Sequence, residues 1–368
     1  MAIPQVKTQA LNLGQGSTPE IERKVLFIGV ADGSALAGAV FLSSDSDLDD
    51  LMGESDSELK THVEAAILSA GTGFEAAYIE ISNFAEWPAA LEVAMETFSP
   101  ELVAVCTPIT DKSDLSDAQV TAVEQTNTLE RLVTVCMTSP GITNLQSWPD
   151  YVTAQALFTD SLACDRVVVV PDLCGNNLGA LVGRLAKKEV SIADSPIRKQ
   201  TGPDIALAAF PVDKDGKSLT LATLTALHNT ARLTVPFWFT DVQGIFWTDC
   251  LTLDAVGGDF QLVQHRRVVD KASRAIRLLT INEIGNRQFN QTETSIKLYQ
   301  GIFEKPLRDM SKSVTVNGKA IPGEIKLPND AVTIQWVDAD TVKIYYKLTP
   351  YKSVTEIINN VFLDLSNA

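Results

Sequence analysis

The chain has 368 residues, of which 45% are hydrophobic and 21% charged, so it can bury the core of two or three domains or of one large domain. Its formal net charge of −16 disfavours binding to nucleic acid or to an anionic membrane surface, because both would repel it. No secretion signal and no membrane-spanning run is expected. Five scattered cysteines and three distant histidines predict no disulfide framework and no metal site, which favours synthesis in a reducing cytosol.

Residues 1–17 are predicted to form an extended N-terminal arm. Val6 and two later apolar positions are separated by polar residues, and the segment ends in a cluster of Gly, Ser, Thr and Pro that breaks regular structure. An extended terminal strand either pairs with a neighbouring chain or frays. The residues of the arm leave both alternatives open.

Residues 18–250 alternate continuous apolar strands with amphipathic helices. The predicted strands are 24–31, 75–81, 101–109, 131–138, 165–173 and 204–212. The predicted helices are 55–71, 86–98, 116–130, 148–162 and 176–188. In the first helix Leu59, Val63, Ile67 and Leu68 are expected to share the buried face. This alternation predicts an α/β domain whose mostly parallel sheet is covered by helices on both faces.

The pattern changes after residue 250. Residues 259–289 read as a long helical stretch, and residues 331–348 read as a hairpin whose strands flank an Asp-Ala-Asp turn. The last residues, 354–368, are apolar and β-prone and are predicted to form a C-terminal arm. The expected organisation is therefore an N-terminal arm, the α/β domain, an α+β region over 251–353 and the C-terminal arm.

No group of residues predicts catalysis, a cofactor or a metal. Gly29, Gly33 and Gly38 follow an apolar strand, but their spacing matches no phosphate-binding loop and no Lys follows. Cys174 stands near a helix start, where a thiolate could be activated, but a small buried cysteine is the expectation. The acidic stretch 45–50 opens like a calcium loop, yet Asp50 stands where that loop needs Gly. We expect a solvated acidic loop there.

The helical stretch carries an unusual amount of positive charge for so acidic a chain. Its apolar residues recur at helical spacing and predict one buried face, formed by Val268, Ala272, Ile276 and Leu279. Arg267, Lys271 and Arg274 form an adjoining basic stripe, and Asp270 is spaced to pair with Arg267 or Arg274. Four of the five basic positions are Arg, which suits partly desolvated pairing with carboxylates. The five positions are Arg266, Arg267, Lys271, Arg274 and Arg277. A solvated face and a protein-docking surface both remain open.

Four phrases from the second half of the chain occur together: "NNLGALVGRLAKKEVSIADSPIRKQTG", "FWTDCLTL", "GGDFQLVQHRRVVDKASRAIR" and "FEKPLRDM". Together they resemble the sheath subunits of contractile bacteriophage tails, in the branch of Mu-like or related phages and prophages. The resemblance covers about residues 165–368, whereas the N-terminal half is similar only in its α/β style. It implies a structural protein that polymerises as stacked six-fold rings around a tail tube and contracts to drive the tube through the host envelope.

The resemblance also implies partners and arm residues. Both arms would exchange strands with neighbouring subunits, and the N-terminal one would bend at a hinge formed by Gly14 and Gly16. The strand positions are Ile3, Val6, Leu11, Leu13, Ile357, Ile358, Val361, Leu363 and Leu365. Implied partners are further copies of the chain, the tail tube protein, and the baseplate and tail terminator proteins, with no nucleic acid and no membrane insertion. The subunit would assemble in the host cytoplasm and reside in the virion tail.

The basic helix would then meet acidic groups of the tube or of an adjacent subunit through Arg267, Lys271 and Arg274. Three other interpretations compete with this one. The strand and helix alternation would also suit a cytosolic α/β nucleotide-binding enzyme. The segment from Arg266 to Arg277 would suit a nucleic-acid-binding protein, although the net charge disfavours it. A tube or baseplate component of the same machine is the third alternative.

Overall fold

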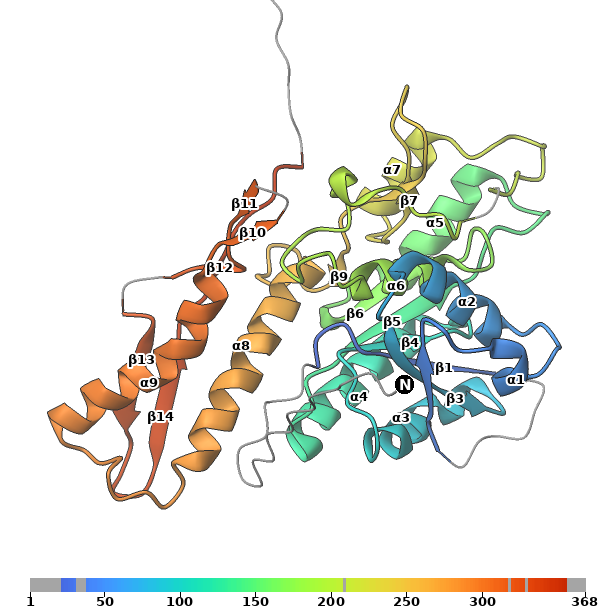
Figure 1. Ribbon diagram of the computed structural model, residues 1–368. Coiled ribbons are helices and arrows are strands. Elements are labelled where there is room, and N and C mark those ends of the chain that lie inside the picture. Colours follow the sequence, from blue (N-terminus) through green and yellow to red (C-terminus); the bar gives the residue numbers. More distant parts are fainter. Residues whose placement is uncertain (1–20, 31–37, 208–209, 317–318, 328–329, 356–368) are drawn as a thin grey trace, which may run out of the picture.

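The computed structural model describes residues 21–355, apart from 31–37, 208–209, 317–318 and 328–329. Figure 1 shows a large α/β lobe and a smaller lobe built from the C-terminal third of the chain. The predicted N-terminal arm, including the hinge at Gly14 and Gly16, lies outside the described residues, as does the C-terminal arm from residue 356 on.

The large lobe is organised around a seven-stranded sheet with the order β2-β3-β1-β4-β5-β6-β9. The strands are β1 (Val25–Val30), β2 (Val40–Ser43), β3 (Glu75–Ile81), β4 (Leu102–Val105), β5 (Thr134–Ser139), β6 (Cys164–Pro171) and β9 (Thr252–Leu253). The five strands from β3 to β6 are parallel, and the two edge strands pair antiparallel to their neighbours. The inner strands are almost entirely buried, as continuous apolar runs predict.

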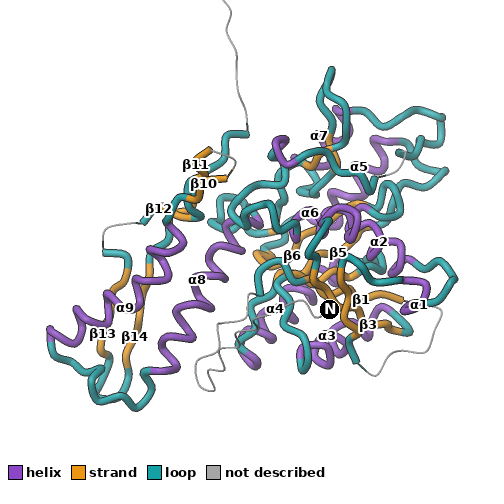
Figure 2. The backbone as a smooth tube through the Cα atoms, in the orientation of Figure 1, coloured by secondary structure: helices purple, strands orange, loops and turns teal. Residues whose placement is uncertain are grey.

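Helices cover both faces of this sheet (Figure 2). In β1, Val25 and Phe27 pack toward one face, whereas Leu26 and Ile28 pack toward the other. The first face is covered by α1 (Leu48–Met52), α2 (Glu58–Ala70) and α6 (Asn177–Ala186). The second is covered by α3 (Trp87–Met95), α4 (Lys112–Leu129), α5 (Trp148–Thr159) and α7 (Leu221–Asn229). Local sequence sets several helix starts: Asp111 and Ser147 each begin a helix with a capping box.

Two glycines bring α6 against α2. A Cβ at Gly179 would lie 2.0 Å from the carbonyl oxygen of His62, and one at Gly183 would lie 2.4 Å from that of Ala66. The Gly179 N–H also donates to Nδ1 of His62 at 3.2 Å. Only glycine permits this close approach of the two helix backbones.

The small lobe packs two long helices on antiparallel strands. The helices are α8 (Val263–Asn282) and α9 (Glu293–Ser311). The strands are β10 (Val314–Val316), β11 (Lys319–Ile321), β12 (Ile325–Lys326), β13 (Val332–Trp336), β14 (Val342–Tyr346) and β15 (Thr349–Pro350). Their core gathers Val268, Ala272, Tyr299, Phe303 and Leu307. Two minor strands of the large lobe, β7 (Pro236–Phe237) and β8 (Phe246–Trp247), and two short turns of 3₁₀ helix, η1 (Phe84–Glu86) and η2 (Lys199–Thr201), complete the described elements.

The predicted fold class is confirmed, as are the strands that became β1, β3, β4, β5 and β6 and the hairpin of β13 and β14. The strand predicted at 204–212 is wrong: its described residues form only isolated bridges, at Asp204 and Val212. The Asp204 carboxylate turns the chain there by accepting the Ala206 N–H. Leu68 is 55% exposed, since α2 buries the stripe that faces α6. The sequence patterns predict no element at α7 or α9.

Candidate functional site

Helix α8 lies between the two lobes (Figure 1). Its predicted buried face is confirmed, because Val268, Ala272 and Ile276 are buried in the core of the small lobe and Leu279 packs against that core. At its start, Val263 joins the core of the large lobe instead. The helix is thus shared by both lobes, and its basic side chains lie at the junction.

The most buried charge contact of this junction joins Arg267 to Glu101. Glu101 immediately precedes β4, and its two carboxylate oxygens accept from Nε and Nη2 of Arg267 at 2.7 and 2.8 Å. The side chains are only 2% and 3% exposed. The carboxylate also accepts the backbone N–H of Arg23 at 2.6 Å. This bidentate geometry ties α8 to the middle of the parallel sheet.

Opposing effects set the ionisation of this pair. Burial by itself would raise the pKa of Glu101, but the charge and hydrogen bonds of Arg267 outweigh it and hold that pKa below its usual value. Burial likewise opposes the charge of Arg267, and Glu101 overcomes it, so the pKa of Arg267 is raised. Both groups are therefore charged in the folded protein.

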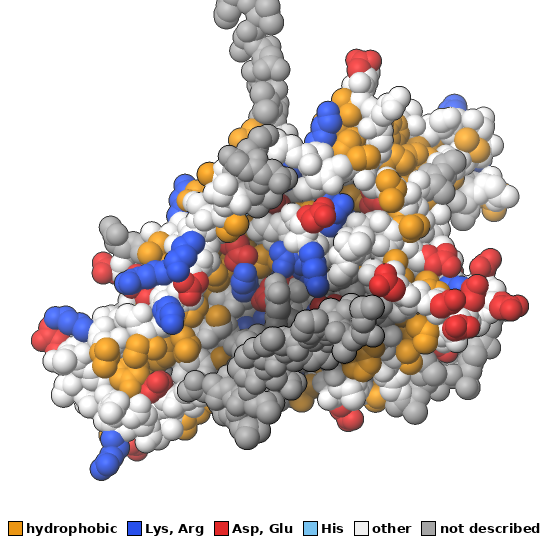
Figure 3. All heavy atoms as spheres, viewed as in Figure 1, with side chains coloured by type: hydrophobic (Ala, Val, Ile, Leu, Met, Phe, Trp, Pro, Cys, Tyr) orange, Lys and Arg blue, Asp and Glu red, His pale blue; other side chains and the backbone are white. Residues whose placement is uncertain are grey.

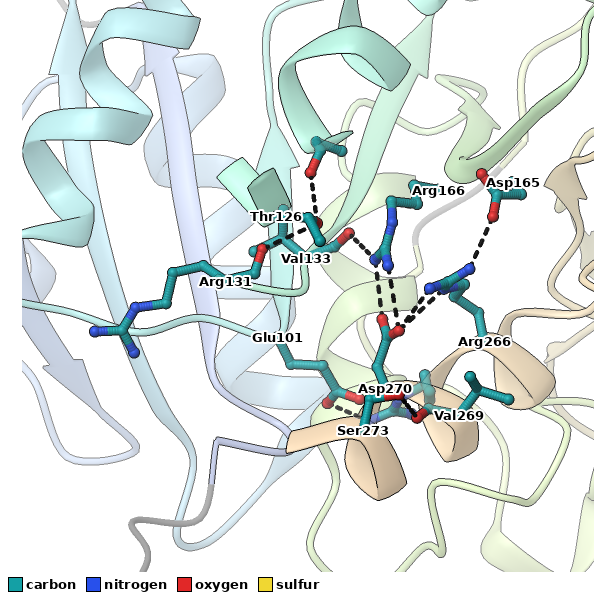
Figure 4. A network of polar contacts seen from close by, with 12 residues as sticks. Glu101, Thr126, Arg131, Val133, Asp165, Arg166, Arg266, Val269, Asp270 and Ser273 are labelled. Carbon is teal, nitrogen blue, oxygen red and sulfur yellow. Dashed lines mark hydrogen bonds and ion pairs between the residues drawn. The ribbon is translucent and has the colours of Figure 1, made fainter. Parts of the chain in front are cut away.

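A second network, drawn in Figure 4, involves Asp270 one turn along the helix. Asp270 accepts from Nη1 and Nη2 of Arg166, on β6, at 3.0 and 3.3 Å, and from Nη2 of Arg266 at 2.8 Å. Nη1 of Arg266 reaches Asp165 at 2.8 Å, and its guanidinium lies 4.5 Å above the ring of Phe260. Arg166 and Asp270 are about 95% buried. The network fastens α8 to the far strand of the parallel set.

Three further pairs surround these two groups. Arg274 pairs with Glu22, ahead of β1, and Arg277 pairs with Glu130, at the end of α4. Lys271 donates to Glu324, beside β12, at 2.6 Å. The first two contacts join the lobes, whereas the third stays within the small lobe.

All five basic residues of the predicted docking helix therefore have acidic partners on the same chain, where the sequence analysis expected partners on another subunit. Of the two alternatives left open for the basic stripe, a solvated face does not hold at Arg267, which is buried because the helix turns that side toward Glu101. The predicted pairing of Asp270 with Arg267 or Arg274 is also wrong, since Asp270 faces Arg166 and Arg266. Contact of Lys271, Arg274 and Arg277 with another subunit stays a prediction.

These partners could not be found from sequence spacing. Glu101 and Arg267 are 166 residues apart, and Asp165 and Arg266 are 101 residues apart. The one available indication was the choice of Arg over Lys, which favours bidentate pairing in desolvated places.

The described residues offer no sign of a reactive or metal-binding centre. Burial raises the pKa of Cys174 to about 12, which disfavours the thiolate that nucleophilic chemistry needs. No group of three or more potential metal ligands occurs among the described residues. Gly29 lies inside β1, where Leu59 and Cys106 pack within 3.1 Å of the place of a Cβ. None of the helices in the described part of the chain is long and apolar enough to span a membrane.

Comparison with known proteins places the chain in a family. Residues 3–251 match the family model of the DUF2586 N-terminal domain, and residues 259–366 match that of the DUF2586 C-terminal domain. The chain is also 41% identical over 376 residues to the "Putative tail sheath protein" of Haemophilus phage HP1, with 99% of each chain covered. The chain belongs to the DUF2586 tail sheath family.

Solved sheath proteins share the fold of this family member. The sheath of the PVC extracellular contractile injection system, in its contracted state, has a TM-score of 0.63 at 13% identity, covering 100% of this chain and 99% of the other. The contracted helical sheath of the anti-feeding prophage has a TM-score of 0.63 at 12% identity, with 98% and 100% covered. The sheath tail protein of Desulfitobacterium hafniense has a TM-score of 0.54 at 13% identity, with 94% and 97% covered. The resemblance noted in the sequence is thus confirmed, and the α/β fold is shared.

Proposed function

We propose that the chain is the structural subunit of a contractile tail sheath. The observation that carries this proposal is the identity of 41% over 99% of the chain to a relative named as a tail sheath protein. Copies of the subunit assemble into a helical cylinder of stacked six-fold rings around the tail tube. On contraction the cylinder shortens and drives the tube through the host envelope. The protein is a structural component of the virion tail and performs no catalysis.

The α8 network has a mechanical role in this proposal. A sheath subunit must move as one body while its contacts with neighbours change. The buried pairs of Arg267 with Glu101 and of Arg166 with Asp270 couple the small lobe to the sheet. Separating the lobes would either expose these charges to water or leave them buried without a partner. The lobes therefore travel together during contraction.

The two arms supply links between subunits. Residues 1–17 and 354–368 add strands to neighbouring copies, with main-chain hydrogen bonds providing affinity and alternate side chains fixing register. Gly14 and Gly16 let the N-terminal arm bend. The segments between them, 18–250 and 251–353, act as the α/β domain and the α+β sheath core. These links hold the cylinder together before and after contraction.

Further partners follow from the place of a sheath in a tail. The inner surface contacts the tail tube protein, and the ends of the cylinder contact the baseplate and tail terminator proteins. Assembly takes place in the host cytoplasm, before release of the virion.

The test is negative-stain electron microscopy of the purified full-length chain, over a range of salt and protein concentrations. We expect cylinders or stacked rings. A chain lacking residues 1–14 should fold with the same circular dichroism spectrum but form no cylinders. Uniform small particles of the full-length chain under every condition would overturn the proposed function. Cylinders from the shortened chain would overturn only the role of the N-terminal arm.

A further inference from the structure

A cleft of about 1350 Å³ opens between α8, α9 and the adjoining edge of the large lobe. Nine basic and six acidic residues line it, in a chain whose net charge is −16. Apolar side chains, among them Leu278, Pro306 and Met310, lie between the charges. In Figure 3 the Lys and Arg side chains gather over this junction of the lobes. The cleft is thus a locally basic, partly apolar surface.

Several of its polar groups lack a partner among the described residues. Nη2 of Arg274 binds Glu22, but Nη1 of the same guanidinium is buried and makes no hydrogen bond with any described residue. The side chains of Arg131 and Lys305, which also line the cleft, form no ion pair within the described part of the chain. A buried donor without a partner is unfavourable, so a ligand with acceptor oxygens would relieve it.

The chain itself carries a segment of matching character. Residues 45–58, which include α1, contain seven acidic residues, all exposed. Within the described part of the chain only Asp49 among them forms an ion pair, with Lys60. Leu51, on α1, is 40% exposed beside them. The segment therefore presents carboxylates and one apolar side chain, which complements both components of the cleft.

Within one subunit the two surfaces cannot meet. In Figure 1, α1 lies at the edge of the large lobe farthest from α8 and α9, and in Figure 3 the acidic side chains gather at that same edge. Complementary patches on opposite sides of one molecule form head-to-tail contacts between copies. Such contacts continue indefinitely unless the rotation closes them into a ring.

We propose that the cleft receives the acidic segment 45–58 of a neighbouring copy of this chain. Carboxylates of the segment pair with Arg131, Arg274 and Lys305, and Leu51 packs on the apolar lining. This contact rests on the proposed function, because it is one of the contacts that build the cylinder. It identifies two of the surfaces that meet in the cylinder. Because the contact pairs opposite charges, assembly should weaken as the salt concentration rises.

The test reverses charge on each surface and then mixes the variants. The segment variant carries Asp50→Lys, Glu54→Lys and Asp56→Lys, which spares the helix-capping Asp47 and the paired Asp49. The cleft variant carries Arg131→Glu, Lys305→Glu and Lys312→Glu, which spares the buried α8 network. Each variant alone should raise the subunit concentration needed for cylinders by about tenfold or more. An equimolar mixture should restore assembly, because reversed segments then find reversed clefts and the variants alternate along the polymer.

The control matched to the segment variant is Glu92→Lys, Glu96→Lys and Glu124→Lys. It makes the same charge change at exposed positions of α3, its C-terminal end and α4, and should assemble like the wild type. Circular dichroism and thermal unfolding establish that each variant folds. If the wild type forms cylinders and either variant matches it, or the mixture fails to recover, the docking proposal is overturned while the proposed function stands. If the wild type forms no cylinders under any condition, the proposed function itself fails.

Discussion

Replacement of Arg267 by Met tests the central contact of the junction. Glu101 would stay buried at 3% exposure but lose two hydrogen bonds of 2.7 and 2.8 Å and the positive charge that they bring against its carboxylate. Removing one partner of such a pair costs about 3–5 kcal/mol, because the remaining charge stays in a dry environment. We expect the free energy of unfolding to fall by about this amount at neutral pH.

The loss should depend on pH with a definite sign. In the wild type the pKa of Glu101 is lowered on folding, so its contribution is present above the ordinary carboxyl pKa and is lost as pH falls through the lowered value. In Arg267→Met, burial acts without the opposing arginine and raises that pKa. The stability of the variant then decreases as pH rises from the ordinary value through the raised one. The difference between the two proteins is therefore larger at pH 7.5 than at pH 5.

Urea unfolding followed by tryptophan fluorescence at both pH values measures these differences. Adding Glu101→Gln to Arg267→Met removes the unpaired charge and should recover at least about 1 kcal/mol. Lys297→Met, at an exposed pair on α9, is the matched control and should change stability by less than about 0.5 kcal/mol. A loss below about 1 kcal/mol in Arg267→Met, or no recovery in the double variant, would refute the reasoning.

Three further changes test the packing. Gly179→Ala should lower the melting temperature by several degrees, because its Cβ would lie 2.0 Å from the carbonyl oxygen of His62, whereas Gly301→Ala, in open space on α9, should raise it slightly by helix propensity. Phe303→Ala should cost about 3–5 kcal/mol in urea unfolding, since the side chain is fully buried; a loss near zero would mean that the small lobe is loosely packed. Burial lowers the pKa of His62 to about 4, so the unfolded state binds a proton more readily and the free energy of unfolding should fall as pH drops from about 6.5 toward 4. Calorimetry of His62→Asn should show a weaker pH dependence of stability over that interval. An equally steep dependence in the variant would exclude His62 as the cause.

The regular elements of the large lobe follow from local sequence. Each inner strand is an apolar run of the right length, and α5 begins where Ser147, Pro149 and Asp150 together supply a cap, a first-turn proline and the second half of a capping box. Such features act over a few residues, so they can be read without knowing the fold. Helix α9 was not predicted, because Gly301 and Pro306 interrupt its helical pattern. Its buried face, formed by Tyr299, Phe303 and Leu307, becomes evident only in the packed lobe.

The sequence by itself determined the α/β alternation and the amphipathic character of α8. It also indicated that the arginines of α8 pair with carboxylates. The tertiary structure decided which carboxylates those arginines meet. Local spacing favoured Asp270 for Arg267, yet the helix orientation set by Val268, Ala272 and Ile276 turns Arg267 toward Glu101, 166 residues away. A partner brought in by strand order and helix packing leaves no trace in sequence spacing, because burial of the apolar face, rather than the charges, fixes how the helix is rotated.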